Sequence, residues 1–471
     1  MRLDLLLIFT PFVIAKVSGD ENDKVVVGYY VPWGKVQPNQ LNYDKVTHIN
    51  YGFGVLTKKD DPASIFIDPF YDGNAINKLK ELARPKGVKI QMSIGGWTGS
   101  QTFSLVARDP ALRQKFINNA LVFVRKNTKT SNDGTPNGWD LDGIDIDWEY
   151  PGRAAAVCNV YDAADSANYL LLLKELRAAL DKEFPNEHKL LTAAVRVQPF
   201  DGPNGTPLPD VSQYAQYFDF INVMAYDING DWPWQAWLNA KWPANKLVMG
   251  LPFYGRSLTA KVDMNSDPSN QYVIKEGSVP RGDPTDSLES NSFCRSESTY
   301  GGLWAWKYLR SQILTDGPTS PVAGWSRYWD NTTQTPWLFS ASSKTYISYD
   351  DPQSLRIKVD YTKQQGLRGV MFWDITNDLN DELLDTLQAI RDSSSITNRR
   401  TTTSKIAKQI SSNPLTEVNL CANASPWRPE VGYGGTQKVI YRGRLWQVKW
   451  QNKGDTPGEG ARSWSNIGAC N

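Results

Sequence analysis

The segment DGIDIDWEYP, residues 142–151, interleaves acidic residues with apolar ones. The apolar residues, which are typical of a buried strand, are Ile144, Ile146 and Trp148. The acidic residues are Asp142, Asp145, Asp147 and Glu149. Buried charge is costly unless it is paired or used. The segment therefore indicates a site at which several carboxyl groups have a task.

In a β-strand over residues 143–150, side chains alternate between two faces, so Asp145, Asp147 and Glu149 share one face. Neighbours on that face lie about 6.6 Å apart, and at an effective dielectric constant of about 20 two unit charges then repel by roughly 2.5 kcal/mol. We expect the three carboxyl groups to titrate as a coupled set that retains a proton at neutral pH. Such a proton suits general acid catalysis. Asp142 is out of phase and is expected to give support from below.

Two other interpretations fit this pattern less well. A DxDxD segment can bind calcium, but calcium loops need glycine and oxygen ligands where this segment has isoleucine and tryptophan. A purely structural cluster of acids would leave the cost of burying them without compensation.

Seven further apolar runs, separated in several places by helical patterns, predict more strands. The runs are VVVGYYV (25–31), KVTHINYGF (45–53), KIQMSIGG (89–96), KLLTAAVRV (189–197), FDFINVMAYD (218–227), KLVMGLPF (246–253) and GVMFWDIT (369–376). Helices are predicted over 103–126, 166–184 and 351–366. Such a series predicts an α/β fold, a (β/α)8 TIM barrel, with a doubly wound open sheet as the alternative. Glu149 then lies nearest the C-terminal mouth, where barrels of this kind carry their active sites.

The 471 residues are too many for one average domain. Residues 1–19 have the charge and apolar pattern of a signal peptide, which predicts an extracellular, secreted protein. We predict a catalytic barrel over 20–392 with an inserted α+β subdomain at about 259–345, because so long a structureless loop is rare. A Ser/Thr-rich linker (393–420) and a small all-β module (421–471) follow.

Composition excludes several classes of function. Lys and Arg number 51 against 50 Asp and Glu, which indicates neither a nucleic acid nor a membrane as partner. His48 and His188 are interpreted as structural, which argues against a Ser-His-Asp triad. No Cys/His cluster indicates a metal. Four cysteines allow three pairings, of which Cys421–Cys470 is favoured and Cys158–Cys294 is the remainder.

Several segments, in order, resemble the family-18 glycoside hydrolases, the chitinases and their relatives. Besides DGIDIDWEY they are THINYGF (47–53), SIGGW (93–97), MAYD (224–227), GLPFYGRS (250–257) and GVMFWDITND (369–378). The resemblance covers roughly residues 24–390, and YWDNTTQTPWLF is similar to exo-acting bacterial chitinases. It implies a chitinase that hydrolyses β-1,4-linked N-acetylglucosamine polymers, with chitin and chito-oligosaccharides as partners and no cofactor or metal. We expect a monomer.

The resemblance also implies roles for individual residues, within a retaining mechanism in which the substrate's N-acetyl oxygen is the nucleophile. Glu149 is the general acid, Asp147 orients the acetamido group and Asp145 shares charge or a proton with Asp147. Tyr226 steadies the acetamido carbonyl. The other residues expected to bind substrate are Trp373, Trp97, Trp232, Asp227, Met224, Tyr29, Arg256 and Asp142.

The last fifty residues resemble small chitin- and cellulose-binding modules. Many of these carry two adjacent tryptophans, whereas here Trp450 is followed by Gln451. Trp446 and Tyr433 are the candidates to take the place of the second ring. Two alternatives to a chitinase remain: a catalytically silent chitin-binding lectin, and an endo-β-N-acetylglucosaminidase that acts on glycoproteins. Such lectins typically lack the acid at the position of Glu149, and the insertion and the module argue against the second alternative.

Overall fold

The computed structural model describes residues 24–130, 136–227, 235–268, 279–288, 299–392, 425–429, 431–433, 437–448, 452–458 and 463–469. The described chain divides into two compact units, and each is treated by itself. The predicted signal peptide and linker lie outside the described residues and stay predictions. Among the helices of the described ranges, none has the length and apolar character that crossing a membrane requires.

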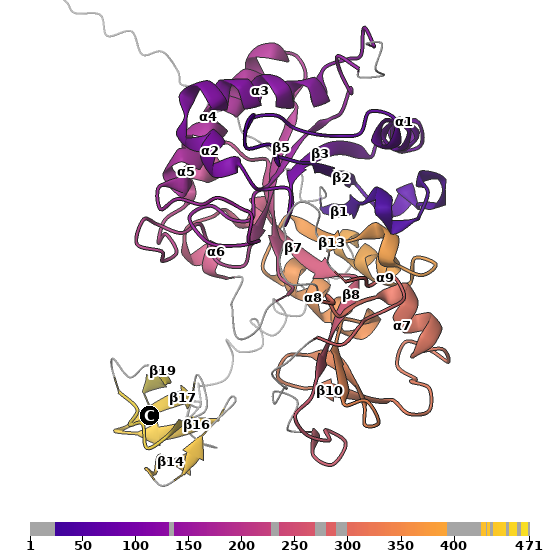
Figure 1. Cartoon of the computed structure of the whole chain (residues 1–471). Coiled ribbons are helices and arrows are strands. Elements are labelled where there is room, and N and C mark those ends of the chain that lie inside the picture. The colour runs from indigo at the N-terminus through magenta and orange to yellow at the C-terminus, as the bar shows by residue number, and fades with distance from the viewer. Residues whose placement is uncertain are drawn as a thin grey trace, which may run out of the picture. The chain divides into compact units, whose positions relative to one another are not determined.

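A closed barrel of eight parallel strands forms the centre of the first unit (Figure 1). Around the barrel the strands follow the order β1-β13-β7-β6-β5-β4-β3-β2. They are β1 (Val25–Tyr30), β2 (His48–Gly54), β3 (Lys89–Gly95), β4 (Gly143–Asp147), β5 (Leu190–Arg196), β6 (Phe220–Met224), β7 (Leu247–Pro252) and β13 (Gly369–Trp373). Seven of the predicted runs contain one of these strands whole, and the run 45–53 contains all of β2 except Gly54, so the barrel is confirmed and the open sheet is wrong.

Helices pack on the outside of the barrel, and the larger hydrophobic core lies between the two layers. The α-helices of the described residues are α1 (Tyr71–Ala83), α2 (Phe103–Arg108), α3 (Pro110–Val124), α4 (Asp165–Glu183), α5 (Ser212–Ala215), α6 (Ala236–Asn239), α7 (Trp306–Gln312), α8 (Pro352–Gln364) and α9 (Glu382–Leu387). Short 3-10 helices are η1 (Pro32–Gly34), η2 (Pro38–Gln40), η3 (Tyr43–Lys45), η4 (Arg84–Lys86), η5 (Ala244–Lys246), η7 (Ile375–Asn377) and η8 (Gln388–Arg391).

The single helix predicted over 103–126 is wrong, because two helices, α2 and α3, meet at Asp109. The Asp109 carboxylate accepts hydrogen bonds from the backbone N–H groups of Ala111 and Leu112, and Pro110 follows it as the first residue of α3. An acidic N-cap followed by proline is a strong signal for a helix start.

A five-stranded antiparallel sheet with the order β10-β11-β12-β8-β9 interrupts the barrel between β7 and β13. Its strands are β8 (Tyr254–Thr259), β9 (Leu303–Ala305), β10 (Ser326–Asp330), β11 (Thr335–Ser340) and β12 (Thr345–Ser348). The sheet begins five residues before the expected start of the insertion, because β8 follows β7 almost directly. In the hairpin of β10 and β11, Tyr328 stacks on Trp337 with ring centroids 4.3 Å apart.

The described residues of the second unit form short strands around a small aromatic core. Strands β14 (Ser425–Pro426), β16 (Lys438–Tyr441), β17 (Arg444–Val448) and β19 (Trp464–Ala469) form one sheet, and β15 (Gly432–Tyr433) pairs with β18 (Asn452–Lys453). The core consists of Tyr433, Val439, Trp446, Val448 and Trp464.

Candidate active site

The acidic residues of the decisive segment rise through the barrel to its C-terminal mouth. Asp145 and Asp147 belong to β4, and Glu149 follows two residues after the strand ends. The exposed fraction grows from 0 % at Asp145 to 3 % at Asp147 and 8 % at Glu149, so Glu149 is nearest to solvent. The predicted alternation is confirmed, because the apolar residues between them belong to the core outside the barrel: Ile144, Ile146 and Trp148.

Three hydroxyl groups from neighbouring strands surround Asp145. Ser93 of β3 and Tyr29 of β1 donate hydrogen bonds of 2.8 and 2.7 Å to Asp145 Oδ2. Thr192 of β5 donates one of 2.6 Å to Oδ1. Burial raises the pKa of Asp145, and the three hydrogen bonds oppose that rise because they favour the ionised form. Ser93 and Thr192 lie directly across from Asp145 in the strand register, a placement that sequence reasoning did not use.

Asp147 and Glu149 form a coupled pair above this cage. Burial, then the charges of Glu149 and Asp145, raise the pKa of Asp147 well above its usual range. Its Oδ1 atom is buried and has no hydrogen-bond partner among the described residues. Burial raises the pKa of Glu149 to about 7, with a further rise from the charge of Asp227 and an opposing hydrogen bond from Tyr150. A large fraction of Glu149 is therefore protonated at neutral pH.

The backbone that carries the coupled pair is held by residues that sequence reasoning missed. Ser100 Oγ donates to the carbonyl oxygen of Asp147 (2.9 Å) and accepts from the N–H of Glu149 (3.2 Å). Asn159 Nδ2 donates to the carbonyl oxygen of Glu149 (2.9 Å). A Cβ on Gly95, where φ is +119°, would lie 2.1 Å from the Asp147 carbonyl oxygen, so this approach requires glycine. Polar residues in loops have no periodic pattern that would reveal such contacts.

Tyr226 and Asp227 follow the end of β6, which is two strands from β4 around the barrel, and Asp227 is paired with Arg256 of β8. Burial raises the pKa of Tyr226 well above its usual range, so its hydroxyl group stays protonated and can donate a hydrogen bond. Asp227 accepts two hydrogen bonds from Arg256, with Nε–Oδ1 at 2.8 Å and Nη2–Oδ2 at 2.7 Å. Arg256 also donates to the carbonyl oxygen of Gly301 (2.9 Å). Met224 ends β6 and packs, half-buried, against the core inside the barrel.

Aromatic side chains line the same end of the barrel. Trp373, the last residue of β13, stacks on Phe53 at 5.8 Å with an interplanar angle of 14°. Phe53 in turn lies 6.2 Å from the ring of Trp33. Trp33 and Trp97 are 57 % and 49 % exposed, so both rings can contact a ligand. Sequence reasoning missed Phe53 and Trp33, while Trp232 lies outside the described residues and stays a prediction.

Two residues expected to bind substrate are placed elsewhere. Tyr29 is 1 % exposed, and its hydroxyl group is used by Asp145, so it supports the carboxyl stack rather than contacting a sugar. Asp142 precedes β4 at the opposite end of the barrel. There it accepts a hydrogen bond from the N–H of Ile90 (2.9 Å) and forms an ion pair with Lys89 (3.1 Å). Asp142 therefore stabilises the N-terminal end of the barrel, which agrees with its phase in the sequence.

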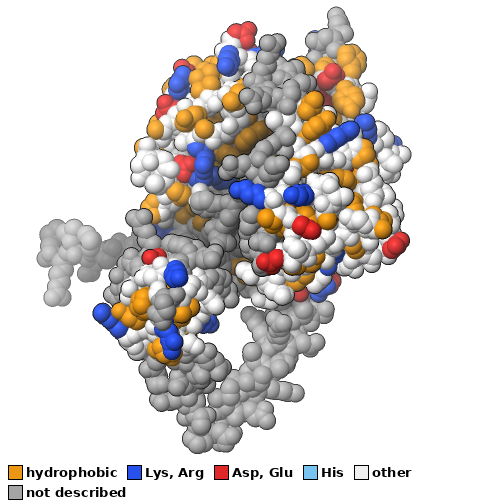
Figure 2. All heavy atoms as spheres, turned by 60° about the horizontal axis from the view of Figure 1, so that its bottom comes forward, with side chains coloured by type: hydrophobic (Ala, Val, Ile, Leu, Met, Phe, Trp, Pro, Cys, Tyr) orange, Lys and Arg blue, Asp and Glu red, His pale blue; other side chains and the backbone are white. Residues whose placement is uncertain are grey.

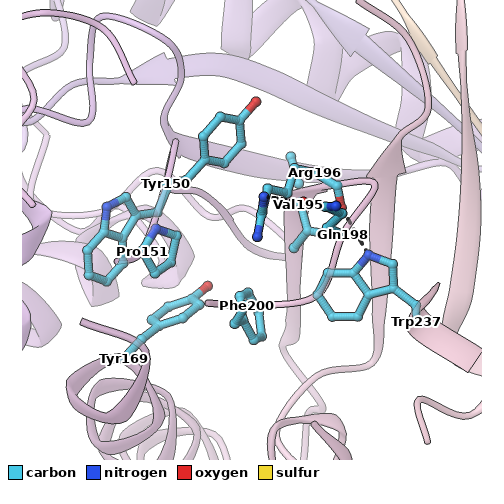
Figure 3. Close-up of a pocket in the computed structure, with 10 residues that line it drawn as sticks. Tyr150, Pro151, Tyr169, Val195, Arg196, Gln198, Phe200 and Trp237 are labelled. Carbon is cyan, nitrogen blue, oxygen red and sulfur yellow. Dashed lines mark hydrogen bonds between the residues drawn. The ribbon is translucent and has the colours of Figure 1, made fainter. Parts of the chain in front are cut away.

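A small pocket lies beside the site, next to Tyr150 (Figure 3). Tyr150 and Arg196 lie on one side of it, and Tyr169, Phe200 and Trp237 lie on the other. Trp237 Nε1 donates to the carbonyl oxygen of Arg196 (2.9 Å). The pocket is therefore lined both by Tyr150, the residue after Glu149, and by Arg196 at the end of β5.

The structure places the predicted binding residues of the C-terminal module in its core. Trp446 and Tyr433 are only 5 % and 7 % exposed, and both pack within the aromatic cluster of the module. Each ring is covered by its neighbours, which leaves little of it for contact with a sugar, and the binding role of both residues stays a prediction. Trp450 lies outside the described residues and stays a prediction.

The remaining histidine, cysteine and metal predictions have mixed outcomes. His48 Nδ1 lies 2.8 Å from Thr47 Oγ1, and His188 Nε2 lies 2.6 Å from Asp219 Oδ1, so each has a structural partner. Cys158 is disulfide-bonded, but the other three cysteines lie outside the described residues, so both pairings stay predictions. Within the described ranges no three His, Cys, Asp or Glu side chains are grouped so as to hold a metal ion.

Comparisons with known proteins agree with this geometry. The model of the family "Glycosyl hydrolases family 18" matches residues 25–378. A chitinase-like effector of Moniliophthora roreri is 29 % identical over 399 residues, which cover 77 % of this chain and 92 % of that protein. Chitinase A1 of Niallia circulans is 29 % identical over 472 residues, covering 83 % and 62 %. The crystal structure of a chitinase from Rhizomucor miehei has a TM-score of 0.67 and 31 % identity, covering 78 % of this chain and 100 % of that one.

Proposed function

The chain belongs to glycosyl hydrolase family 18 and is a glycoside hydrolase, and from this premise we propose a chitinase in which Glu149 is the general acid. Its substrates are β-1,4-linked N-acetylglucosamine polymers and their oligomers. The observation that carries the proposal is the coupled pair at the mouth, in which Glu149 has a pKa of about 7 and lies above Asp147. We also propose that the protein is secreted, on the pattern of residues 1–19.

The proposed reaction uses these groups in two steps. Glu149 gives its proton to the glycosidic oxygen as the bond from that oxygen to the anomeric carbon breaks. The N-acetyl carbonyl oxygen of the same sugar forms the new bond to the anomeric carbon, which produces a cyclic oxazolinium ion. The ionised Glu149 then takes a proton from water as the water oxygen attacks the anomeric carbon and reopens the ring.

Asp147 and Tyr226 have complementary tasks in these steps. The unpartnered Oδ1 of Asp147 can accept a hydrogen bond from the acetamido N–H, which orients the nucleophile. The positive charge of the intermediate opposes the raised pKa of Asp147 and favours its ionised form, whose negative charge in turn stabilises the intermediate. The hydroxyl group of Tyr226, which stays protonated, donates to the acetamido carbonyl. Trp373 supplies a flat surface under the reacting sugar.

A catalytically silent lectin is less well supported than an enzyme. A lectin needs no proton on Glu149, whereas burial here raises the pKa of Glu149 to about 7, so a large fraction of the molecules carry that proton at neutral pH. No observation favours an endo-β-N-acetylglucosaminidase acting on glycoproteins. The direct test of the proposed mechanism is the pH dependence and the stereochemistry of the reaction.

We expect kcat/KM for a soluble chito-oligosaccharide to fall above a pH of about 7. The general acid must be protonated, and the pKa of Glu149 is raised to about 7, so the active fraction falls about tenfold per pH unit above that value. The measurement is a pH–rate profile with a separate check that the protein stays folded. An alkaline limb that stays flat beyond pH 9 would contradict the assignment of Glu149.

The first product is expected to be the β-anomer. Attack by the acetamido oxygen inverts the anomeric carbon once and attack by water inverts it again, so the configuration is retained. One-dimensional NMR during the first minutes of hydrolysis separates the two anomers before they equilibrate. An α-anomer as the initial product would exclude the substrate-assisted mechanism.

A further inference from the structure

The C-terminal region and the rest of the chain carry net charges of opposite sign. Residues 393–471 contain 11 Lys and Arg against 4 Asp and Glu, whereas residues 1–392 contain 40 against 46. The net charge of +1 is therefore the sum of a C-terminal region of +7 and a remainder of −6. An asymmetry of this kind is typical of chains whose basic part binds an anionic partner.

Three arginines of the module gather at one end of its larger sheet, and we refer to Arg428, Arg442 and Arg444 as the arginine cluster. Arg442 lies in the turn between β16 and β17, and Arg444 lies across from Tyr441 in the strand register. Arg428 follows Trp427, and the backbone N–H of Trp427 donates a hydrogen bond to the carbonyl oxygen of Ile440 in β16. All three arginines are exposed.

Two aromatic rings adjoin the arginine cluster, because Trp427 precedes Arg428 and Tyr441 precedes Arg442. Trp427 and Tyr441 lie edge to face, with centroids 5.3 Å apart and an interplanar angle of 76°. The guanidinium carbon of Arg442 lies 5.3 Å from the centroid of the Tyr441 ring. Both rings are only partly buried. This end of the module therefore offers positive charge beside apolar ring surface.

These cations have no acidic partner in the described part of the module. None of the three arginines, nor the exposed Lys438 and Lys453, forms an ion pair there, whereas the ion pairs of the barrel unit include many of its Lys and Arg residues. Figure 2 shows the module at the lower left, with Lys and Arg side chains around its visible outline. Unpaired charge of one sign attracts a partner of the opposite sign.

We propose that the arginine cluster binds a carboxylated polysaccharide. The planar guanidinium group matches a carboxylate with two parallel hydrogen bonds, and several arginines side by side match a polymer that repeats its charge. The partly exposed rings of Trp427 and Tyr441 can pack on the apolar face of a sugar. The choice of a polysaccharide over nucleic acid or a lipid bilayer rests on the proposed function, whereas the anionic character of the partner does not.

The test uses the full chain and polygalacturonate as the probe. The variant Arg428→Gln/Arg442→Gln/Arg444→Gln is expected to lose about tenfold or more of the affinity measured at low ionic strength, because each exposed charge contact contributes modestly. The wild-type affinity is expected to fall as salt is raised from about 20 mM to 300 mM, since exposed charges are screened. Hydrolysis of a soluble chito-oligosaccharide by the variant is expected to stay unchanged, which shows that the catalytic unit is folded.

The matched control removes the same number of charges from the first unit. Lys58, Lys59 and Arg108 are exposed, and Lys58→Gln/Lys59→Gln/Arg108→Gln is expected to keep its affinity within about twofold. Equal loss in both variants, or binding that salt does not affect, overturns the proposal. Tighter binding to a DNA duplex or to phosphatidylserine vesicles than to polygalacturonate overturns the choice of a polysaccharide. A chain that fails to cleave chito-oligosaccharides but binds polygalacturonate through the cluster contradicts only the proposed function.

Discussion

Replacing Glu149 by glutamine is expected to lower kcat/KM for chito-oligosaccharides by roughly three orders of magnitude, since a positioned general acid contributes about 10² to 10⁴. Glutamine keeps the shape of the side chain but cannot give a proton to the glycosidic oxygen. The change also removes the charge that helps to raise the pKa of Asp147, so Asp147 is expected to ionise more readily in the variant. Initial rates of reducing-end release and the affinity for a non-cleaved oligomer are the measurements.

Substrates with different leaving groups distinguish the loss of a general acid from a general loss of structure. An aryl glycoside needs little protonation, so the loss in kcat/KM for Glu149→Gln is expected to be at least about tenfold smaller on such a substrate. Asp72→Asn is a suitable control, because burial raises the pKa of Asp72 as well and its carboxylate accepts a hydrogen bond from Tyr51 outside the mouth. Wild-type turnover by Glu149→Gln on both substrates would remove Glu149 from the mechanism.

The variant Asp147→Asn is expected to lose roughly two to three orders of magnitude in kcat/KM, and equally on both kinds of substrate. Asparagine removes the charge that stabilises the oxazolinium ion. Electrostatic stabilisation of this kind contributes about 10² to 10³ in rate. An aryl leaving group does not replace the oriented acetamido nucleophile, so the loss does not shrink. The comparison is made on the same two substrates, with thermal unfolding as a check of the fold.

The two variants therefore give different patterns if the roles are correct. A loss for Asp147→Asn that shrinks on the aryl glycoside would show that Asp147 acts on the leaving group instead. Preserved formation of the β-anomer by Asp147→Asn at a near wild-type rate would show that the nucleophile does not depend on Asp147. Either result would require a different division of labour between the two carboxyl groups.

The sequence predicts most of the barrel because each buried parallel strand leaves an uninterrupted apolar run. It also predicts the inward face of β4, since alternation is a local property. Contacts between distant segments are not local, and this is why the cage around Asp145 and the loop residues Ser100 and Asn159 were missed. The break between α2 and α3 was overlooked although Asp109 and Pro110 signal it in the sequence.

Several of the predicted site residues have a type that fits two roles. An aromatic ring stacks on sugar or fills a core, and in the module Trp446 and Tyr433 do the second. Tyr29 stands in an apolar strand near the mouth, yet its hydroxyl group is turned to Asp145. The balanced net charge of the whole chain also concealed the opposite net charges of residues 1–392 and 393–471, because a net charge carries no information on position.

The hydroxyl groups around Asp145 affect the pKa values of the site but do not contact the sugar. Ser93 and Thr192 lie deep in the barrel, beyond the reach of a polysaccharide. Their hydrogen bonds oppose the rise in the pKa of Asp145, and the charge of Asp145 raises the pKa of Asp147 above it. Substitutions at Ser93 or Thr192 are therefore expected to shift the working pH of this hydrolase while the surface that recognises the polymer stays the same.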